Sequence, residues 1–155
     1  MENIRHILII SRMYPYSHKA ILFGISLART FNAKLLVLHL VSNPVDMVAL
    51  NAPGLFPEEY TNYIYSQPAI KEQLDTIIKE EIREGFPIKE LTSYYDSVDE
   101  IVRVVSEEKA DLILVNAHEE GRFEHALFGG DNDALIRRMP CSILLLKEEL
   151  EPPKC

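Results

Sequence analysis

Short apolar runs alternate along the chain with longer segments in which apolar residues recur every three or four positions. The runs lie at 7–11, 35–41, 88–94, 112–115 and 142–146, and each has the length of a strand. In all but the third, apolar residues fill consecutive positions, which is typical of strands buried on both faces of a parallel sheet. The sequence therefore predicts five strands.

The segments between these runs have the periodicity of helices. A first helix is predicted from Ser17 to about Asn32, because asparagine tolerates the left-handed backbone that ends many helices. A third helix is predicted to open with the capping box of Ser97 and Glu100, and a fourth to end before Pro140. The residues expected to face the core are Ala20, Ile21, Gly24, Leu27, Ala28 and Phe31 in the first helix, Ile70, Leu74, Ile77, Ile78 and Ile82 in the second, and Val98, Ile101, Val102 and Val105 in the third.

Residues 42–68 break this regular alternation. Five residues, Pro44, Pro53, Gly54, Pro57 and Pro68, interrupt the segment. We expect a long loop with at most a short helical turn, and connections of this length in compact domains are usually functional or mobile. The sequence predicts one domain over residues 1–147, which includes this loop, and a charged, flexible tail over residues 148–155.

Strands that alternate with helices predict an α/β fold: a single open, five-stranded, mostly parallel sheet with helices on both faces. Ligands of such sheets bind beyond the carboxyl ends of the strands, where the strand order reverses. The residues at these positions are Ser11 and Arg12 after the first strand, Leu40 at the end of the second, and Asn116 to Gly130 after the fourth.

The charge balance narrows the classes of partner. With 16 basic and 24 acidic residues, the formal net charge is −8. Nucleic acids and anionic membranes attract Lys- and Arg-rich surfaces, so neither is an expected partner. The 2 cysteines form no disulfide framework, and the apolar run near the amino terminus is too short for a signal peptide or a membrane span. A cytoplasmic protein is expected.

Several segments, taken in their order and spacing, resemble the universal stress protein family. They are Ser17-His18-Lys19-Ala20, residues 33–41, residues 110–115, Leu127-Phe128-Gly129-Gly130 and residues 140–146. The resemblance implies a flavodoxin-like or adenine nucleotide α-hydrolase-like sheet and a stress-response protein that binds rather than catalyses. It also implies a homodimer joined through the last strand, at Ile143, Leu144, Leu145 and Leu146.

Family members that bind ATP carry a Gly-x2-Gly-x9-Gly-Ser/Thr signature after the fourth strand and an aspartate at the end of the first. By position, the signature falls here on Asn116, Glu119, Gly129 and Gly130, and the aspartate is replaced by Arg12. At roughly 5 Å and an effective dielectric of about 20, Glu119 would repel each phosphate charge by about 3 kcal/mol. The resemblance therefore implies a degraded ATP site and weak or absent ATP binding.

The candidate nucleotide site keeps several interpretations open. Its members are Ser11, Arg12, Leu40, Asn116, His118, Glu119, Gly121, Gly129 and Gly130. One hypothesis pairs Arg12 with Glu119 or Asp131, so that an internal ion pair fills the crevice; in another, both side chains are solvated. In a third, Arg12 clamps a phosphate beside Gly129 and Gly130 in an altered geometry, which would leave an ATP-binding stress protein. Separately, Gly121 could provide a shifted turn that reaches the phosphate by another path.

No motif predicts an enzyme, and neither a metal nor an obligatory cofactor is expected. Five potential metal ligands, His118, Glu119, Glu120, Glu124 and His125, crowd one loop but lack the His-Glu-x-x-His spacing, so a solvated charged loop is the simpler interpretation. A slow metal-dependent phosphohydrolase centred on His118 remains a further alternative. His39, flanked by leucines in the second strand, is interpreted as a buried core or near-site residue rather than a ligand.

Overall fold

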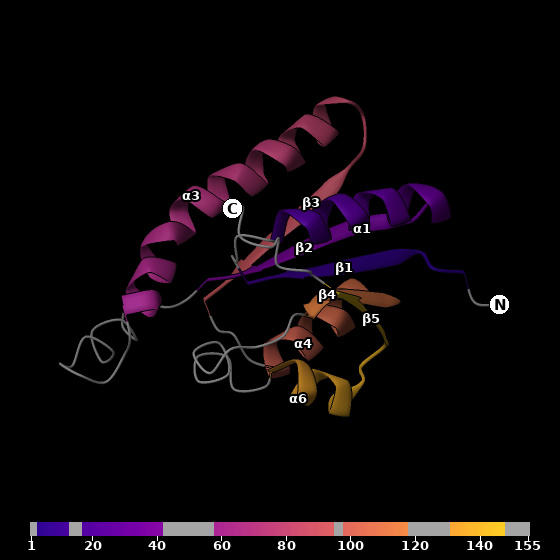
Figure 1. Ribbon diagram of the computed structural model, residues 1–155. Coiled ribbons are helices and arrows are strands. Elements are labelled where there is room, and N and C mark those ends of the chain that lie inside the picture. The colour runs from indigo at the N-terminus through magenta and orange to yellow at the C-terminus, as the bar shows by residue number, and fades with distance from the viewer. Residues whose placement is uncertain (1–2, 13–16, 42–57, 95–97, 118–130, 148–155) are drawn as a thin grey trace.

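The five strands form one open parallel sheet in the order β3-β2-β1-β4-β5. The computed structural model describes residues 3–12, 17–41, 58–94, 98–117 and 131–147 (Figure 1). The predicted α/β class and its parallel sheet are thereby confirmed. The strand order differs from the 2-1-3-4-5 order of flavodoxin itself and places the reversal between β1 and β4. The strands are β1 (His6–Ser11), β2 (Lys34–Leu40), β3 (Ile88–Ser93), β4 (Leu112–Ala117) and β5 (Ser142–Lys147).

Helices cover both faces of this sheet. On one face lie α1 (Ser17–Phe31) and α3 (Glu58–Arg83), and on the other lie α4 (Val98–Glu108) and α6 (Asp131–Arg138) (Figure 1). Because consecutive strands are parallel, each helix carries the chain back across the sheet to start the next strand. No helix in the described part of the chain combines the length and apolar character needed to cross a bilayer.

The core has two layers, one on each side of the sheet. In β1, Ile7 and Ile9 belong to the cluster beneath α1 and α3, whereas Leu8 and Ile10 belong to the cluster beneath α4 and α6. All four side chains are at most 2% exposed. Alternate residues of a strand point to opposite faces, so a strand covered on both sides must be apolar throughout. This explains the uninterrupted apolar run at the start of the chain.

The helices end in caps that the sequence partly predicts. Asn32 has a φ of 52°, and the Ala33 N–H donates to the Ala28 carbonyl at 2.8 Å, as in a Schellman motif. Gly85, with a φ of 99°, ends α3 in the same way, and the Phe86 N–H donates to the carbonyl of Glu81 at 3.0 Å. The predicted stop at Asn32 is confirmed.

The second connection contains more helix than the sequence predicts. The expected loop over 42–68 is wrong for residues 58–68, because α3 begins at Glu58 and runs through Pro68. Residues 42–57 lie outside the described part. A proline inside a helix removes one hydrogen bond, at a cost of about 3 kcal/mol. Burial of Ile70, Leu74 and Ile78 after Pro68 offsets this loss by anchoring the helix on the sheet.

Some side chains predicted to face the core do not. Phe31 and Ile82 are 46% and 45% exposed, and each lies in the last turn of its helix, where the chain turns back toward the sheet. In α4 the buried valines are Val104 and Val105, while Val102 is only partly buried. The buried faces of α1 and α3 therefore end about one turn earlier than predicted, and the buried face of α4 includes Val104, which was not predicted.

Candidate functional site

The carboxyl ends of β1 and β4 flank the point where the strand order reverses. The register between these strands ends at the pair Ile9 and Leu114, whereas β1 stays paired with β2 as far as Ser11. Ser11 and Asn116 each follow the last β1–β4 pair by two residues. Ligands of open α/β sheets bind at such a point, because the helices that follow the two strands leave toward opposite faces. The fold therefore brings Ser11, Arg12 and Asn116 to the predicted end of the sheet.

Arg12 bridges this region from β1 toward α6. Its side chain is only 7% exposed, and its Nη1 donates to Asn132 Oδ1 at 3.0 Å. The Asn132 amide in turn donates from Nδ2 to the Asn116 carbonyl at 3.1 Å. One asparagine thus ties the guanidinium of Arg12 to the end of β4. We call this chain of contacts, Arg12 to Asn132 to Asn116, the arginine bridge.

Two polar atoms beside the arginine bridge have no hydrogen-bond partner among the described residues. They are Ser11 Oγ and Asn116 Oδ1, in side chains that are 1% and 8% exposed. Leaving a buried polar atom unpaired costs about 1–3 kcal/mol, so such atoms usually mark a place for water or a ligand. Both atoms lie at the strand ends where a ligand of this fold binds.

The other predicted site residues fall into two groups. Leu40 is 2% exposed and packs in the core cluster beneath α4 and α6. His118, Glu119, Gly121, Gly129 and Gly130 lie outside the described residues, as does the side chain of Asp131. Pairing of Arg12 with Glu119 or Asp131 therefore stays a prediction.

Asn132 is the site residue that the sequence analysis missed. It lies in the first turn of α6, two positions after the glycine pair 129–130. Its signal was an amide side chain at the start of the helix that follows the candidate phosphate loop. Asparagine is common at helix starts for capping alone, so this signal is weak without the structure.

His39 lies next to Ser11 in the register of β2 with β1. Its side chain is completely buried, and its Nε2 lies 2.9 Å from Glu90 Oε1 on β3. Burial lowers the pKa of His39, because a charged imidazole would lose its hydration, although the hydrogen bond with Glu90 acts in the opposite direction. The predicted burial is confirmed, but the carboxylate partner was not foreseen.

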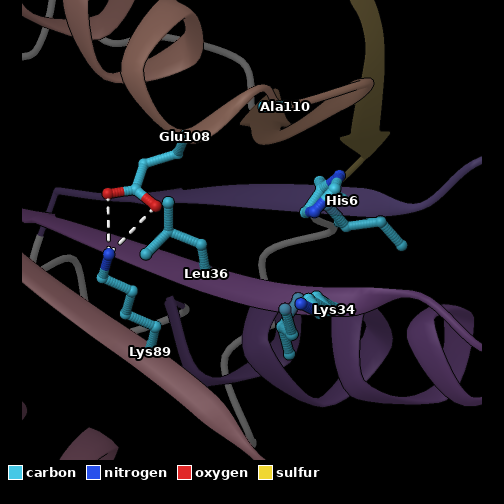
Figure 2. Close-up of a pocket in the computed structure, with 8 residues that line it drawn as sticks. His6, Lys34, Leu36, Lys89, Glu108 and Ala110 are labelled. Atoms are coloured by element: carbon cyan, nitrogen blue, oxygen red, sulfur yellow. Dashed lines mark hydrogen bonds and ion pairs between the residues drawn. The ribbon is translucent and has the colours of Figure 1, made fainter.

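A separate hollow lies near the amino ends of β1, β2 and β3 (Figure 2). Its volume is about 90 Å³, and a hydrogen-bonded ion pair between Lys89 and Glu108 borders it, with N–O distances of 2.8 and 3.0 Å. Ligand pockets usually measure about 300–1,000 Å³ and open at the carboxyl ends of the strands. This hollow is too small for a nucleotide and lies at the opposite end of the sheet. The residues labelled in Figure 2 are His6, Lys34, Leu36, Lys89, Glu108 and Ala110.

The strand predicted to join two copies lies at the edge of the sheet. Within the described chain, β5 pairs with β4 alone. Leu145 is 46% exposed, and Ile143, Leu144 and Leu146 are partly exposed. An apolar edge strand with one free side is a template for pairing with another chain.

Comparison with known proteins identifies the family. Residues 3–147 match the profile of the Universal stress protein family. This chain is a member of the universal stress protein family. No protein of curated function matches the sequence of this universal stress protein at a significant level.

Solved structures of other universal stress proteins share the fold. UspA from Lactobacillus plantarum superposes with a TM-score of 0.65 at 16% identity, over 94% of this chain and 99% of that one. A universal stress protein in complex with cAMP superposes with a TM-score of 0.55 at 18% identity, over 94% of this chain and 98% of that one. A universal stress protein from Archaeoglobus fulgidus in complex with dAMP superposes with a TM-score of 0.54 at 16% identity, over 94% of this chain and 98% of that one. At sequence identities this low, the similarity shows that the fold is shared and shows nothing further.

Proposed function

We propose that this universal stress protein acts in the stress response as a homodimeric binding module whose affinity for ATP is weak or lost. The observation that carries the proposal is the arginine bridge. It crosses from β1 to α6 and β4 at the end of the sheet where a nucleotide would bind, and it is built from a buried cation.

The arginine bridge opposes ligand entry because a nucleotide must displace it. A hydrogen bond to a charged group contributes about 1.5–3 kcal/mol, so breaking the contact between Arg12 and Asn132 lowers the affinity by about 10- to 150-fold. Arg12 also replaces the aspartate that the family resemblance places at this position. Binding without catalysis fits a sequence in which no nucleophile and base form a recognisable motif.

A second candidate function is a working adenine-nucleotide-binding protein. Two structural neighbours were solved with cAMP and dAMP. Ser11 Oγ and Asn116 Oδ1, for which the described residues supply no partner, offer hydrogen bonds to such a ligand. If Arg12 turned from Asn132 toward a phosphate, its guanidinium would form a two-pronged clamp.

The two candidates respond in opposite ways to removal of the guanidinium. We expect no adenine nucleotide in an acid extract of the freshly purified protein. We also expect Arg12→Ala to increase ATP affinity, because this change removes the contact that a nucleotide must displace. Nucleotide in the extract, together with loss of binding in Arg12→Ala, would establish the second candidate instead. Arg103→Ala is the matched control, since Arg103 is an exposed arginine on α4 that pairs with Glu100 and Glu107.

The proposed homodimer rests on the exposed apolar residues of β5. We expect light scattering to give the mass of two chains for the wild type and of one chain for Leu145→Lys, which brings like charges together across the two-fold axis. Leu22→Lys is the matched control, because Leu22 is a leucine of similar exposure, 49%, on α1. A monomeric wild type, or dissociation by both variants, contradicts an interface at β5.

A further inference from the structure

Three potential metal ligands converge between α3 and the neighbouring strands β2 and β3. They are His39 on β2, Asp75 on α3 and Glu90 on β3, and one nitrogen or oxygen ligand atom of each lies within 4.8 Å of the others. His39 lies on the sheet face that α3 covers, because Val37 and Leu35, two and four positions earlier, belong to the core cluster beneath α1 and α3. The register pairs His39 with Thr92 and Val37 with Glu90, so the histidine reaches Glu90 diagonally across the two strands.

We propose that His39, Asp75 and Glu90 form a binding site for a zinc-type divalent cation, in which Lys71 holds the place of the metal until the ion displaces it. The site requires no nucleotide and lies on elements other than those of the arginine bridge. Its success or failure is therefore independent of the proposed function.

The position of Lys71 shows that this cluster favours a cation. The ammonium of Lys71 contacts the carboxylate of Asp75 and lies 3.8 Å from Glu90 Oε1. Two carboxylates share one lysine, so the group keeps an excess negative charge when His39 is neutral. A divalent ion in place of the ammonium balances both carboxylates. The Lys71 side chain can move away from the carboxylates without disrupting the fold, because it lies on the surface of α3 and is 31% exposed.

His39 supplies the nitrogen that favours zinc over magnesium or calcium. Imidazole with carboxylates is a donor set suited to zinc, whereas the harder ions prefer oxygen alone. His39 Nε2 already points at Glu90, at 2.9 Å from Oε1. Its other nitrogen, Nδ1, has no partner in the described part of the chain, and neither has Oγ of its register neighbour Ser11. Metal-bound histidines normally donate from their second nitrogen to an outer acceptor, and Ser11 Oγ is a candidate for this role.

The geometry requires only small movements. With bonds of about 2.0–2.2 Å, the ligands of a tetrahedral zinc lie about 3.3–3.6 Å apart. The three ligand atoms now lie within 4.8 Å of one another, and His39 Nε2 lies 2.9 Å from Glu90 Oε1, so no separation has to change by more than about 1.5 Å. Glu90 and Asp75 are 30% and 29% exposed, so the ion has a route from solvent and a fourth position remains for water.

Calorimetric titration of the full chain with zinc chloride tests the site. We expect saturable binding of a single ion by the wild type, and binding weakened by about tenfold or more in Asp75→Asn and Glu90→Gln. Lys71→Met removes the competing cation, so we expect it to bind zinc more tightly than the wild type. A merely structural ion pair predicts no such gain. Lys79→Met, a change of another exposed lysine of α3, should leave the affinity unchanged.

Zinc could instead bind to His118 and His125, and a variant that lacks both histidines tests this alternative. The double variant His118→Ala, His125→Ala removes the histidines of the acidic segment 118–125 and should leave the tight binding intact. The proposal is overturned if neither the wild type nor Lys71→Met binds zinc saturably. It is also overturned if Asp75→Asn and Glu90→Gln bind zinc as the wild type does, or if the double histidine variant alone abolishes binding. Circular dichroism of each variant confirms that the fold is retained.

Discussion

Replacing Gly24 by alanine tests how closely α1 lies on the sheet. A Cβ built at Gly24 would lie 2.3 Å from Ile9 Cδ1 and 2.9 Å from Ile9 Cγ1, with Leu114 Cδ2 at 3.4 Å. Ile9 and Leu114 are completely buried, so neither side chain has free space to move into. Only a glycine lets the helix approach the central strand this closely.

The magnitude follows from two opposing effects. Overpacking a filled core costs about 1–3 kcal/mol, whereas alanine is favoured over glycine inside a helix by about 1 kcal/mol. We expect Gly24→Ala to lower the free energy of unfolding by up to about 2 kcal/mol. For a chain of this size, the melting temperature then falls by up to about 8 °C.

Urea denaturation of a double-mutant cycle is the assay. Ile9→Val alone costs about 0.5–1.5 kcal/mol, but it removes the Cδ1 atom that the new methyl would meet. In the double variant, Gly24→Ala should therefore cost about 1 kcal/mol less than in the wild type. Ser26→Ala, at an exposed position of the same helix, should change stability by less than about 0.5 kcal/mol. Additive effects of Gly24→Ala and Ile9→Val, or a stabilising Gly24→Ala, would show that α1 does not lie this close to Ile9.

Two further predictions concern stability. Ile78→Ala should cost about 2–5 kcal/mol and Ile82→Ala less than about 1 kcal/mol in urea unfolding, because Ile78 is completely buried and Ile82 is 45% exposed; equal losses would contradict the position of α3. The pKa of Asp111 is lowered mainly by a hydrogen bond from the backbone N–H of Arg5, and also by one from the backbone N–H of His6. The Asp111 carboxylate therefore stabilises the fold at pH values above the ordinary pKa of aspartate. This stabilisation is lost as the pH falls through the lowered pKa. Asp111→Asn should therefore lose less stability than the wild type on acidification. If the urea midpoints of the two proteins fell by the same amount as the pH was lowered below about 4, this prediction would be contradicted.

The sheet could be predicted because its signal is local. A strand that is covered on both faces must be apolar at every position, and Ile7 to Ile10 satisfy this without reference to the rest of the chain. The end of α1 at Asn32 could likewise be predicted from a single residue type, because asparagine tolerates a positive φ. The start of α3 was not, because Pro68 opposes a helix locally and only the packing of α3 against the sheet overrides it.

The candidate site could be predicted only in part. The sequence directs attention to Ser11, Arg12 and Asn116, since the ends of parallel strands meet at one edge. It does not identify Asn132 as a partner of Arg12, because that contact spans 120 positions and depends on where α6 begins. The partnership of His39 with Glu90 was hidden for the same reason, since it depends on the register of β2 with β3.

Calorimetric titration with ATP, with and without magnesium, tests most directly whether the arginine bridge has replaced a nucleotide. We expect the wild-type protein to show no saturable heat at ATP concentrations up to about 100 μM, which corresponds to a binding free energy weaker than about −5.5 kcal/mol. A dissociation constant near 1 μM, about −8 kcal/mol, would show that the end of the sheet still accepts the ligand and would contradict the account.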